Sequence, residues 1–381
     1  MPTYPTPDLL TELAEARPDG GVVSLYLDTD PRKPENASDN PAWLVQLRNG
    51  LRTAGAQLEA SGDRDAVLAW RDVPGRIEAR VRGLSAAERG RALAFFTTPD
   101  GSWERIITSH LTLDEPHGAF DDRPWVAPLA KLVDRGRAIG VVLLDSDEMS
   151  MVRWADGRVD EPGVDSDLEA FRSENITGGE GGHDPRLRTH SEQLASRADE
   201  HQRRFLADAA ARVARALPDL DVNSFVVVHA PGSYGHFADA LPPDVADRIV
   251  GTVEAHLTGL DPAEVGDRFE EDLAEVSRRR GASVAAEALE RAASGGAASV
   301  NAGQVLRALA QHRVGDLVLS PNVTLSADAV GEMADSFLAG VPETHLVERV
   351  IEQAITTGAT VTVADSPELA EAGGVAAILR W

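Results

Sequence analysis

A glycine-rich segment near the middle of the chain holds the residues with the clearest chemical potential. It consists of Gly178, Gly179, Glu180, Gly181, Gly182 and His183. Glycine pairs allow positive φ angles, so backbone amides in such a loop can approach another backbone or a phosphate closely. His183 can donate or accept a hydrogen bond and can act as a general base near neutral pH. The alternative is a surface loop with acidic neighbours and no chemistry of its own.

Other site types are disfavoured by the sequence. His183, Asp184 and His190 are the nearest approach to a metal-ligand cluster, but their spacing does not match the i, i+4 histidine pair of zinc motifs. The chain also has no P-loop, no dinucleotide fingerprint and no G-x-S-x-G elbow. It contains no cysteine, which excludes disulfides, thiolate metal sites and a cysteine nucleophile. We therefore expect neither a metal nor a cofactor.

An arginine-rich helix is predicted directly after the glycine-rich segment. Apolar residues from Leu187 to Leu217 recur at spacings near 3.6, and Pro218 ends the pattern. Residues 186–215 contain seven arginines and four acidic residues. Because the planar guanidinium suits phosphates and stacked bases, we predict RNA contacts for a set of arginines, namely Arg186, Arg188, Arg197, Arg203 and Arg204. The alternative is a solvated helix face with i, i+4 ion pairs such as Glu200–Arg204 and Asp208–Arg212.

Composition limits the possible partners and the number of domains. The 381 residues include 62 acidic and 37 basic side chains, a formal net charge of −25. This charge argues against a protein that coats nucleic acid loosely through a basic surface. The longest apolar run, residues 138–144, is too short to span a bilayer, and the N-terminus lacks the pattern of a signal peptide. We expect a cytoplasmic protein of two or three domains, with no membrane or DNA partner.

The order of predicted elements divides the chain into three blocks of α/β character. The first, residues 1–137, is predicted to contain helices over 7–17, 41–60, 63–82 and 127–135, a strand over 21–28, and a hairpin of strands 93–97 and 105–109. The second, residues 138–260, opens with a buried strand over 138–145, a meander at 149–161 and an irregular stretch over 162–185. The long helix and a strand over 223–230 follow, which together predict a mixed sheet.

The third block, residues 261–381, alternates helices and strands. Helical sequence to residue 293 precedes a strand (298–300), a helix (302–312), a strand (316–320) and helices at 327–338 and 344–357. Strands over 359–364 and 374–381 complete the pattern. This alternation predicts an α/β/α sandwich.

Four stretches of the sequence carry a resemblance to a known family. They are the strand 21–27, the glycine-rich segment with its following helix, the helix–strand pair 305–320 (VLRALAQHRVGDLVLS) and the closing segment 373–381 (GGVAAILRW). Together they resemble the archaeal and eukaryotic class-one peptide-chain release factors and Pelota, with their bacterial homologues. The glycine-rich segment falls where that family has its GGQ loop. The resemblance implies three domains with bounds 1–137, 138–260 and 261–381.

Departures from the family pattern narrow the expected function. His183 stands where the family has the catalytic Gln, and the segment Glu59–Arg64 contains no NIKS-like motif. A stop-codon-reading cysteine motif is impossible without cysteine. Within the bacterial branch the chain is most similar to the group that includes the ribosome hibernation factor Balon. This implies occupation of the A site of idle ribosomes, with ribosomal RNA as partner and the third domain contacting the translational GTPase EF-Tu.

Two functions of different classes are therefore expected. The favoured one is a binding factor for hibernation and stress protection that neither decodes stop codons nor catalyses a reaction. The rival is a peptidyl-tRNA hydrolase of the ribosome-rescue type, in which Gly181, Gly182 and His183 act in the peptidyl transferase centre. A recruitment of the fold to an unrelated stress role is a third alternative.

Overall fold

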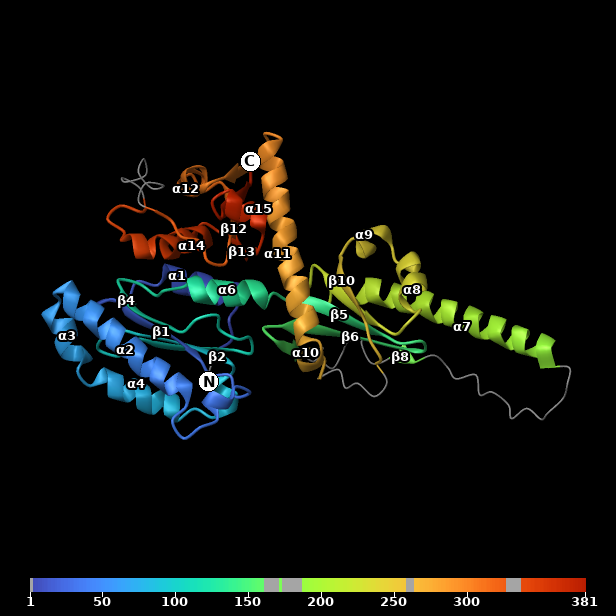
Figure 1. Cartoon of the computed structure of the whole chain (residues 1–381), viewed down its shortest axis with the longest axis horizontal. Coiled ribbons are helices and arrows are strands. Elements are labelled where there is room, and N and C mark those ends of the chain that lie inside the picture. The colour runs from blue at the N-terminus through green and yellow to red at the C-terminus, as the bar shows by residue number, and fades with distance from the viewer. Residues whose placement is uncertain (1–2, 161–170, 173–186, 258–263, 327–336) are drawn as a thin grey trace. The chain divides into compact units, whose positions relative to one another are not determined.

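Three β-sheets with helices packed on their faces form the described part of the molecule (Figure 1). The computed structural model describes residues 3–160, 171–172, 187–257, 264–326 and 337–381. The fold is of the α/β class, as the sequence predicts. Within these residues, no helix has the length and apolar character needed to cross a membrane.

The first sheet is built from the N-terminal part of the chain. Its strands are β1 (Val22–Asp28), β2 (Ala92–Thr97), β3 (Glu104–Ser109) and β4 (His117–Asp121), in the order β3-β2-β1-β4 with antiparallel pairing throughout. Along β1, alternate side chains enter two different cores, because the sheet is covered on both faces. Val23 and Leu25 pack against helices on one face. Val22 and Tyr26 belong to a core on the other face.

Six α-helices belong to this part of the chain. The core of Val23 and Leu25 is completed by α2 (Ala42–Ser61), α3 (Arg64–Trp70) and α4 (Val73–Arg82), while α1 (Pro7–Glu15) and α6 (Ala127–Arg135) cover the opposite face. The short helix α5 (Ala86–Arg89) precedes β2. Helix α2 approaches β4 closely, since a Cβ atom on Gly118 would lie 2.3 Å from the Cα atom of Gly50. Only glycine permits this contact between two backbones.

The second sheet is mixed, as predicted. Its strands are β5 (Ile139–Leu144), β6 (Glu148–Ala155), β7 (Arg158–Asp160), β8 (Phe171–Arg172), β9 (Phe225–His229) and β10 (Ile249–Glu254). The order is β10-β9-β5-β6-β7, with β8 also paired to β6. Strand β9 runs parallel to β5 and β10, whereas β5 and β6 are antiparallel. The long helix α7 (Leu187–Ala216) and the short helices α8 (Tyr234–Ala240) and α9 (Pro243–Ala246) belong with this sheet.

The third sheet forms the predicted α/β/α sandwich. Its strands β11 (Ala298–Val300), β12 (Val314–Leu319), β13 (Thr360–Val363) and β14 (Val375–Leu379) lie in the order β11-β14-β12-β13. One face packs against α12 (Ala302–Ala310) and α14 (Leu346–Thr356). The other face packs against α11 (Glu270–Ala293) and α15 (Pro367–Glu371). The helix α10 (Val265–Arg268) precedes α11.

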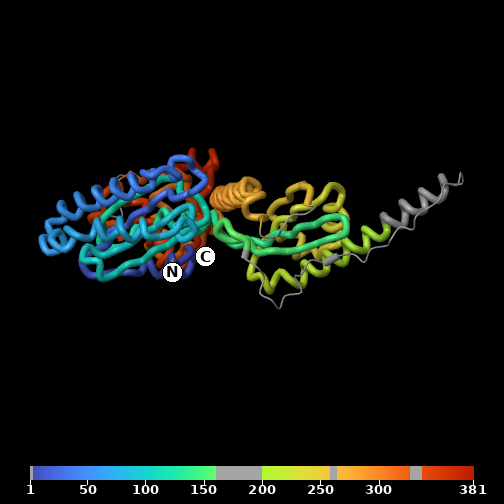
Figure 2. The backbone as a smooth tube through the Cα atoms, turned by 90° about the horizontal axis from the view of Figure 1, so that it is seen from below, coloured from blue at the N-terminus to red at the C-terminus, as the bar shows by residue number. Residues whose placement is uncertain are grey.

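Contacts divide the chain into two compact units. One unit consists of residues 1–137 together with 277–381, and the other of residues 138–276. In the first unit the two ends of the chain share a core, to which α1 and α6 contribute from one end and α12 and α14 from the other (Figures 1 and 2). The predicted bounds of three domains stay a prediction.

Several elements differ from the sequence prediction. The helix predicted over 63–82 is two helices, α3 and α4, because Pro74 lacks a backbone N–H and is tolerated only in a first helical turn. The strands β4 and β10 and the helices α8, α9 and α15 were not predicted. Much of the irregular stretch 162–185 and of the predicted helix 327–338 lies outside the described residues.

Candidate functional site

The predicted loop site lies outside the described residues. This applies to Gly178, Gly179, Gly181, Gly182 and His183, and also to Arg186, the first of the predicted RNA-binding arginines. Their placement relative to one another stays a prediction. The part of the predicted site that the structure describes is helix α7, which begins at Leu187, directly after this segment.

Helix α7 is fixed to its sheet by one apolar face. Phe205, Leu206, Ala209, Ala210, Val213 and Leu217 are buried in the core of the second sheet. Their spacing of three and four residues places them on one side of the helix. Burying this side directs the residues between them outward, and Arg203 and Arg204 are accordingly exposed.

The described arginines of α7 include one local ion pair. The Nε atom of Arg204 lies 3.2 Å from Oε1 of Glu200, one helical turn earlier. This is the i, i+4 ion pair considered in the sequence analysis, and both side chains are mostly exposed. Arg188 and Arg197 also lie on α7, where the structure describes only their backbone. The described part of this helix thus offers Arg203 as an exposed guanidinium beside a paired Arg204.

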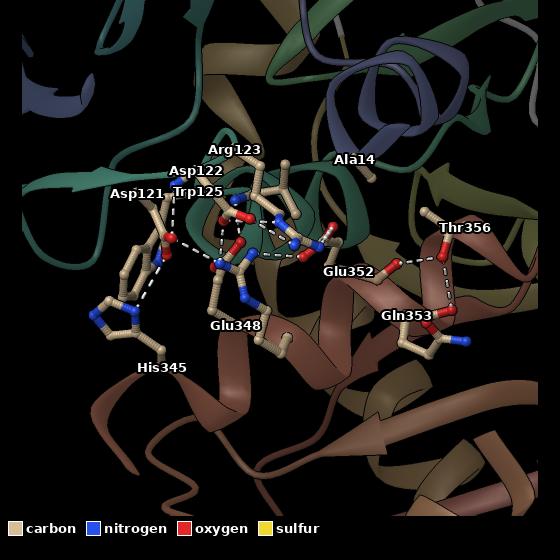
Figure 3. Close-up of polar contacts among 12 residues, drawn as sticks. Ala14, Asp121, Asp122, Arg123, Trp125, His345, Glu348, Glu352, Gln353 and Thr356 are labelled. Atoms are coloured by element: carbon tan, nitrogen blue, oxygen red, sulfur yellow. Dashed lines mark hydrogen bonds and ion pairs between the residues drawn. The ribbon is translucent and has the colours of Figure 1, made fainter. Parts of the chain in front are cut away.

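A second polar cluster, which sequence reasoning missed, lies inside the first unit. It joins residues that follow β4 to the N-terminal half of α14 (Figure 3). Glu348, on α14, is 2% exposed, and its two carboxylate oxygens accept hydrogen bonds from the backbone N–H groups of Val126 and Ala127. The second of these bonds measures 2.8 Å. Because Val126 and Ala127 begin helix α6, Glu348 caps that helix from a segment more than 200 residues away.

Arginines link the remaining carboxylates of this cluster. Arg349 donates to Asp121 and Asp122, each at 2.7 Å, and to Glu352 at 2.8 Å. Arg123 donates to the same Glu352 at 2.9 Å. In Figure 3 the guanidinium of Arg123 lies between Asp122 on one side and Glu352 on the other. A third guanidinium, that of Arg17, lies 2.5 Å from Glu352.

Burial determines the protonation state of Glu348. Desolvation raises the pKa of Glu348 to about 8, and the two backbone hydrogen bonds oppose this change without cancelling it. Burial also raises the pKa of Asp121, whereas the hydrogen bond from Arg123 lowers the pKa of Asp122. With Glu348 neutral at pH 7, three carboxylates face three guanidiniums. The cluster is therefore balanced in charge.

Aromatic rings extend the cluster at one end. The rings of Trp125 and His345 lie 4.7 Å apart at 77°, and His117 lies 4.7 Å from Trp125 on the other side. Nδ1 of His345 lies 3.2 Å from Oδ2 of Asp121. Burial lowers the pKa of His117, with a further contribution from the charge of His345. These contacts make the cluster a structural link between two segments of the first unit that are far apart in sequence.

Neither the described part of helix α7 nor this cluster brings together the ligands of a metal site. Among the described residues, no group of three or more His, Asp and Glu side chains could hold a metal ion. The signal for the cluster in the sequence is weak, because its members come from segments around residues 17, 122 and 350. The run Asp121-Asp122-Arg123 is the visible part, but nothing in the sequence identifies its partners.

Comparisons with known proteins locate a similarity in the middle of the chain. Residues 124–274 match the family described as bacterial archaeo-eukaryotic release factor family 10. No curated protein matches the sequence. Over these residues the chain is similar to the bacterial archaeo-eukaryotic release factors.

Solved structures give low-identity matches over nearly the whole chain. The archaeal translation termination factor aRF1 is 18% identical, with 98% of this chain and 96% of that chain covered and a TM-score of 0.24. Pelota of Archaeoglobus fulgidus is 14% identical, with 100% and 93% covered and a TM-score of 0.34. A ribosome-bound archaeal Pelota is 15% identical, with 100% and 95% covered and a TM-score of 0.38.

Proposed function

We propose that this chain, whose residues 124–274 are similar to the bacterial archaeo-eukaryotic release factors, is a ribosome-binding translation factor. The observation that carries the proposal is the position of the matched residues. They contain both the glycine-rich segment 178–183 and the arginine-rich helix α7. A glycine-rich segment followed by guanidiniums suits a fit into an RNA-lined site, because arginines contact phosphates while glycines permit a close approach.

The finer proposal is that the protein occupies the A site of idle ribosomes and protects them under stress. Stop-codon decoding is not part of this role. The segment Glu59–Arg64, where a codon-reading motif is expected, supports this view, since it contains no NIKS-like motif. It comprises the end of α2, the connection Gly62–Asp63 and the first residue of α3. Gly62 ends α2 in a left-handed conformation, and the carboxylate of Asp63 accepts hydrogen bonds from the N–H groups of Asp65 and Ala66. EF-Tu is the proposed protein partner, through the residues after 261.

The second candidate is peptidyl-tRNA hydrolysis. The sequence observation behind it is an imidazole directly after a glycine pair, at Gly181-Gly182-His183. A histidine can accept a proton from water near neutral pH. It is shorter than glutamine and presents a ring edge in place of a carboxamide, so the positioning of water by a GGQ loop does not transfer to it.

Sedimentation with ribosomes tests the binding role. The protein is incubated with purified ribosomes that carry either an empty or a tRNA-filled A site, and the pelleted fraction is measured. We expect binding to ribosomes with an empty A site and loss of binding when tRNA fills it. Equal binding to both kinds of ribosome would overturn A-site occupation, and no binding to either would overturn the proposed function.

A release assay separates the two candidate functions. Peptidyl-tRNA cleavage on stalled ribosomes is measured for the wild type, His183→Gln and His183→Ala. The binding role predicts no release by the wild type. Release that is lost in His183→Ala would establish the hydrolase in its place.

A further inference from the structure

The outer surface of helices α2 and α4 is basic in a strongly acidic chain. Residues 42–91 contain nine arginines, six acidic residues and no lysine, whereas the whole chain carries −25. Helices α2, α3 and α4 bury one apolar side against the first sheet. Their polar positions therefore face away from the core, and all five arginines on α2 and α4 are exposed: Arg48, Arg52, Arg76, Arg80 and Arg82. We call these five residues the α2–α4 arginine face.

One carboxylate serves two arginines at the centre of this face. Arg48 of α2 forms a two-pronged pair with Glu78 of α4, with distances of 3.0 and 2.8 Å. Arg82 lies 2.9 Å from the same Oε1 atom. The hydrogen bond from Arg48 lowers the pKa of Glu78, so Glu78 is ionised at neutral pH. A single negative charge thus holds two guanidiniums side by side, and one positive charge remains.

Two further arginines are oriented by uncharged oxygens. Nη1 of Arg52 donates to the side-chain oxygen of Asn49 at 3.0 Å, and Nη2 of Arg76 donates to the backbone carbonyl of Asp100 at 3.2 Å. Such acceptors restrict the guanidinium without neutralising it. The remaining arginine, Arg80, lies 3.6 Å from Glu104. The five guanidiniums of the face are therefore matched by two carboxylates.

This arrangement differs from an ordinary solvated helix surface. On such a surface, each arginine pairs with its own acid at i, i+4, as Arg204 does with Glu200 on α7. Here Glu78, the i, i+4 partner of Arg82, is shared with Arg48 of α2. On the α2–α4 arginine face the excess charge lies on side chains that are already partly ordered. Less side-chain entropy is then lost when an anion binds to them.

We infer that the α2–α4 arginine face binds the phosphate backbone of ribosomal RNA. The inference rests on the proposed function, and it adds the surface by which the N-terminal part of the chain contacts the ribosome. Guanidiniums match phosphate oxygens in a planar, two-pronged geometry, and phosphate contacts fix position without reading sequence. A chain with no codon-reading motif in its first block can in this way hold a ribosomal site through charge and shape.

A double substitution tests this surface without touching its ion pairs. In Arg52→Gln/Arg76→Gln, the two arginines held by neutral oxygens are replaced. The matched control is Arg291→Gln/Arg307→Gln, two exposed arginines of α11 and α12, which changes the net charge equally. Binding to purified ribosomes and to a 20-base-pair RNA duplex is measured between 50 and 300 mM KCl, with circular dichroism to verify folding.

The expected result is a shallower salt dependence for the test variant. Each lost phosphate contact reduces the slope of log K against log [KCl] by about 1, so the double variant should lose about 2 while the control keeps the wild-type slope. If ribosomes bind the wild type, and Arg52→Gln/Arg76→Gln shows the same slope as the wild type, the inference is overturned. The proposed function is then left intact.

Parallel arms separate the remaining outcomes. If the wild type binds the RNA duplex but not ribosomes, and the variant loses this binding, the surface is supported and the proposed function fails. Absence of wild-type binding to either RNA overturns both. Poly-glutamate is the competitor that tests for an acidic protein partner. Displacement of RNA by poly-glutamate at equal charge concentration would overturn the assignment of RNA as the partner.

Discussion

Glu348 should make the stability of the first unit fall as the pH rises through neutrality. Its pKa is about 8 in the folded protein, against an ordinary value of 4.5. A carboxyl group whose pKa is raised on folding binds its proton more tightly in the native state. Its contribution is therefore fully present below pH 4.5 and is lost as the pH rises through 8. One pKa unit corresponds to about 1.4 kcal/mol, so the total change is about 5 kcal/mol.

A narrower pH range isolates this group. Burial lowers the pKa of His117 below 6.5, and the remaining titration of this histidine in the unfolded state is common to the wild type and a Glu348 variant, so it cancels in their difference. Between pH 6.5 and 8.0, Glu348 alone should reduce the free energy of unfolding by about 1.5 kcal/mol. Glu348→Gln removes the titration. It also costs about 1–3 kcal/mol at every pH, because an amide NH2 replaces one of the two oxygens that accept from Val126 and Ala127.

The measurement is urea unfolding followed by circular dichroism at pH steps from 6.5 to 8.5. The wild type should lose stability across the range, Glu348→Gln should start lower and stay nearly flat, and the control Glu371→Gln, on an exposed residue of α15, should follow the wild type. Parallel curves for the wild type and Glu348→Gln would refute the reasoning, because they would show that Glu348 does not titrate in this range.

Three further predictions concern stability. Arg349→Ala leaves three carboxylates without their shared cation and should cost about 3–5 kcal/mol, measured by thermal unfolding; a loss under 1 kcal/mol would contradict the role of this ion-pair network. Gly118→Ala forces the backbone of Gly50 away and should lower the free energy of unfolding, measured with urea, by at least about 2 kcal/mol. The control is Gly75→Ala, which lies in open space on α4 and should stabilise the protein by about 0.5–1 kcal/mol. Equal effects of the two substitutions would count against this packing argument. Phe205→Ala should cost about 3–5 kcal/mol and increase proteolysis of α7, and unchanged protease resistance would show that this side chain does not anchor the helix.

Local patterns predicted most of the secondary structure. The helix over 127–135 and the strand over 21–28 were visible because each has one dominant period or an unbroken apolar run. Pro74 marks the break between α3 and α4 in the sequence, although the spacing of apolar residues across it is that of a single helix. Strand β4 was missed, since His117–Asp121 has few apolar residues and becomes a strand by pairing with β1.

The cluster around Glu348 could not be predicted for a different reason. The contacts that define it join residues near position 125 to residues near position 350. No spacing rule connects segments so far apart, and an isolated Glu348 on an amphipathic helix is indistinguishable from a surface residue. The same holds for the α2–α4 arginine face, where Glu78 counts as one acid in the sequence but serves two arginines in the structure.

The shared core of the first unit sets an order of events during synthesis. Helices α1 and α6 cover one face of the first sheet, but the apolar sides of these helices that share a core with α14 and β14 stay uncovered until those elements have been made. At about 5–20 residues per second, translation from residue 137 to residue 379 takes about 10–50 s. During this time an apolar surface of the nascent chain stays open while residues 138–276 can already fold. Because this apolar surface stays open, we expect the protein to need a chaperone during its own translation.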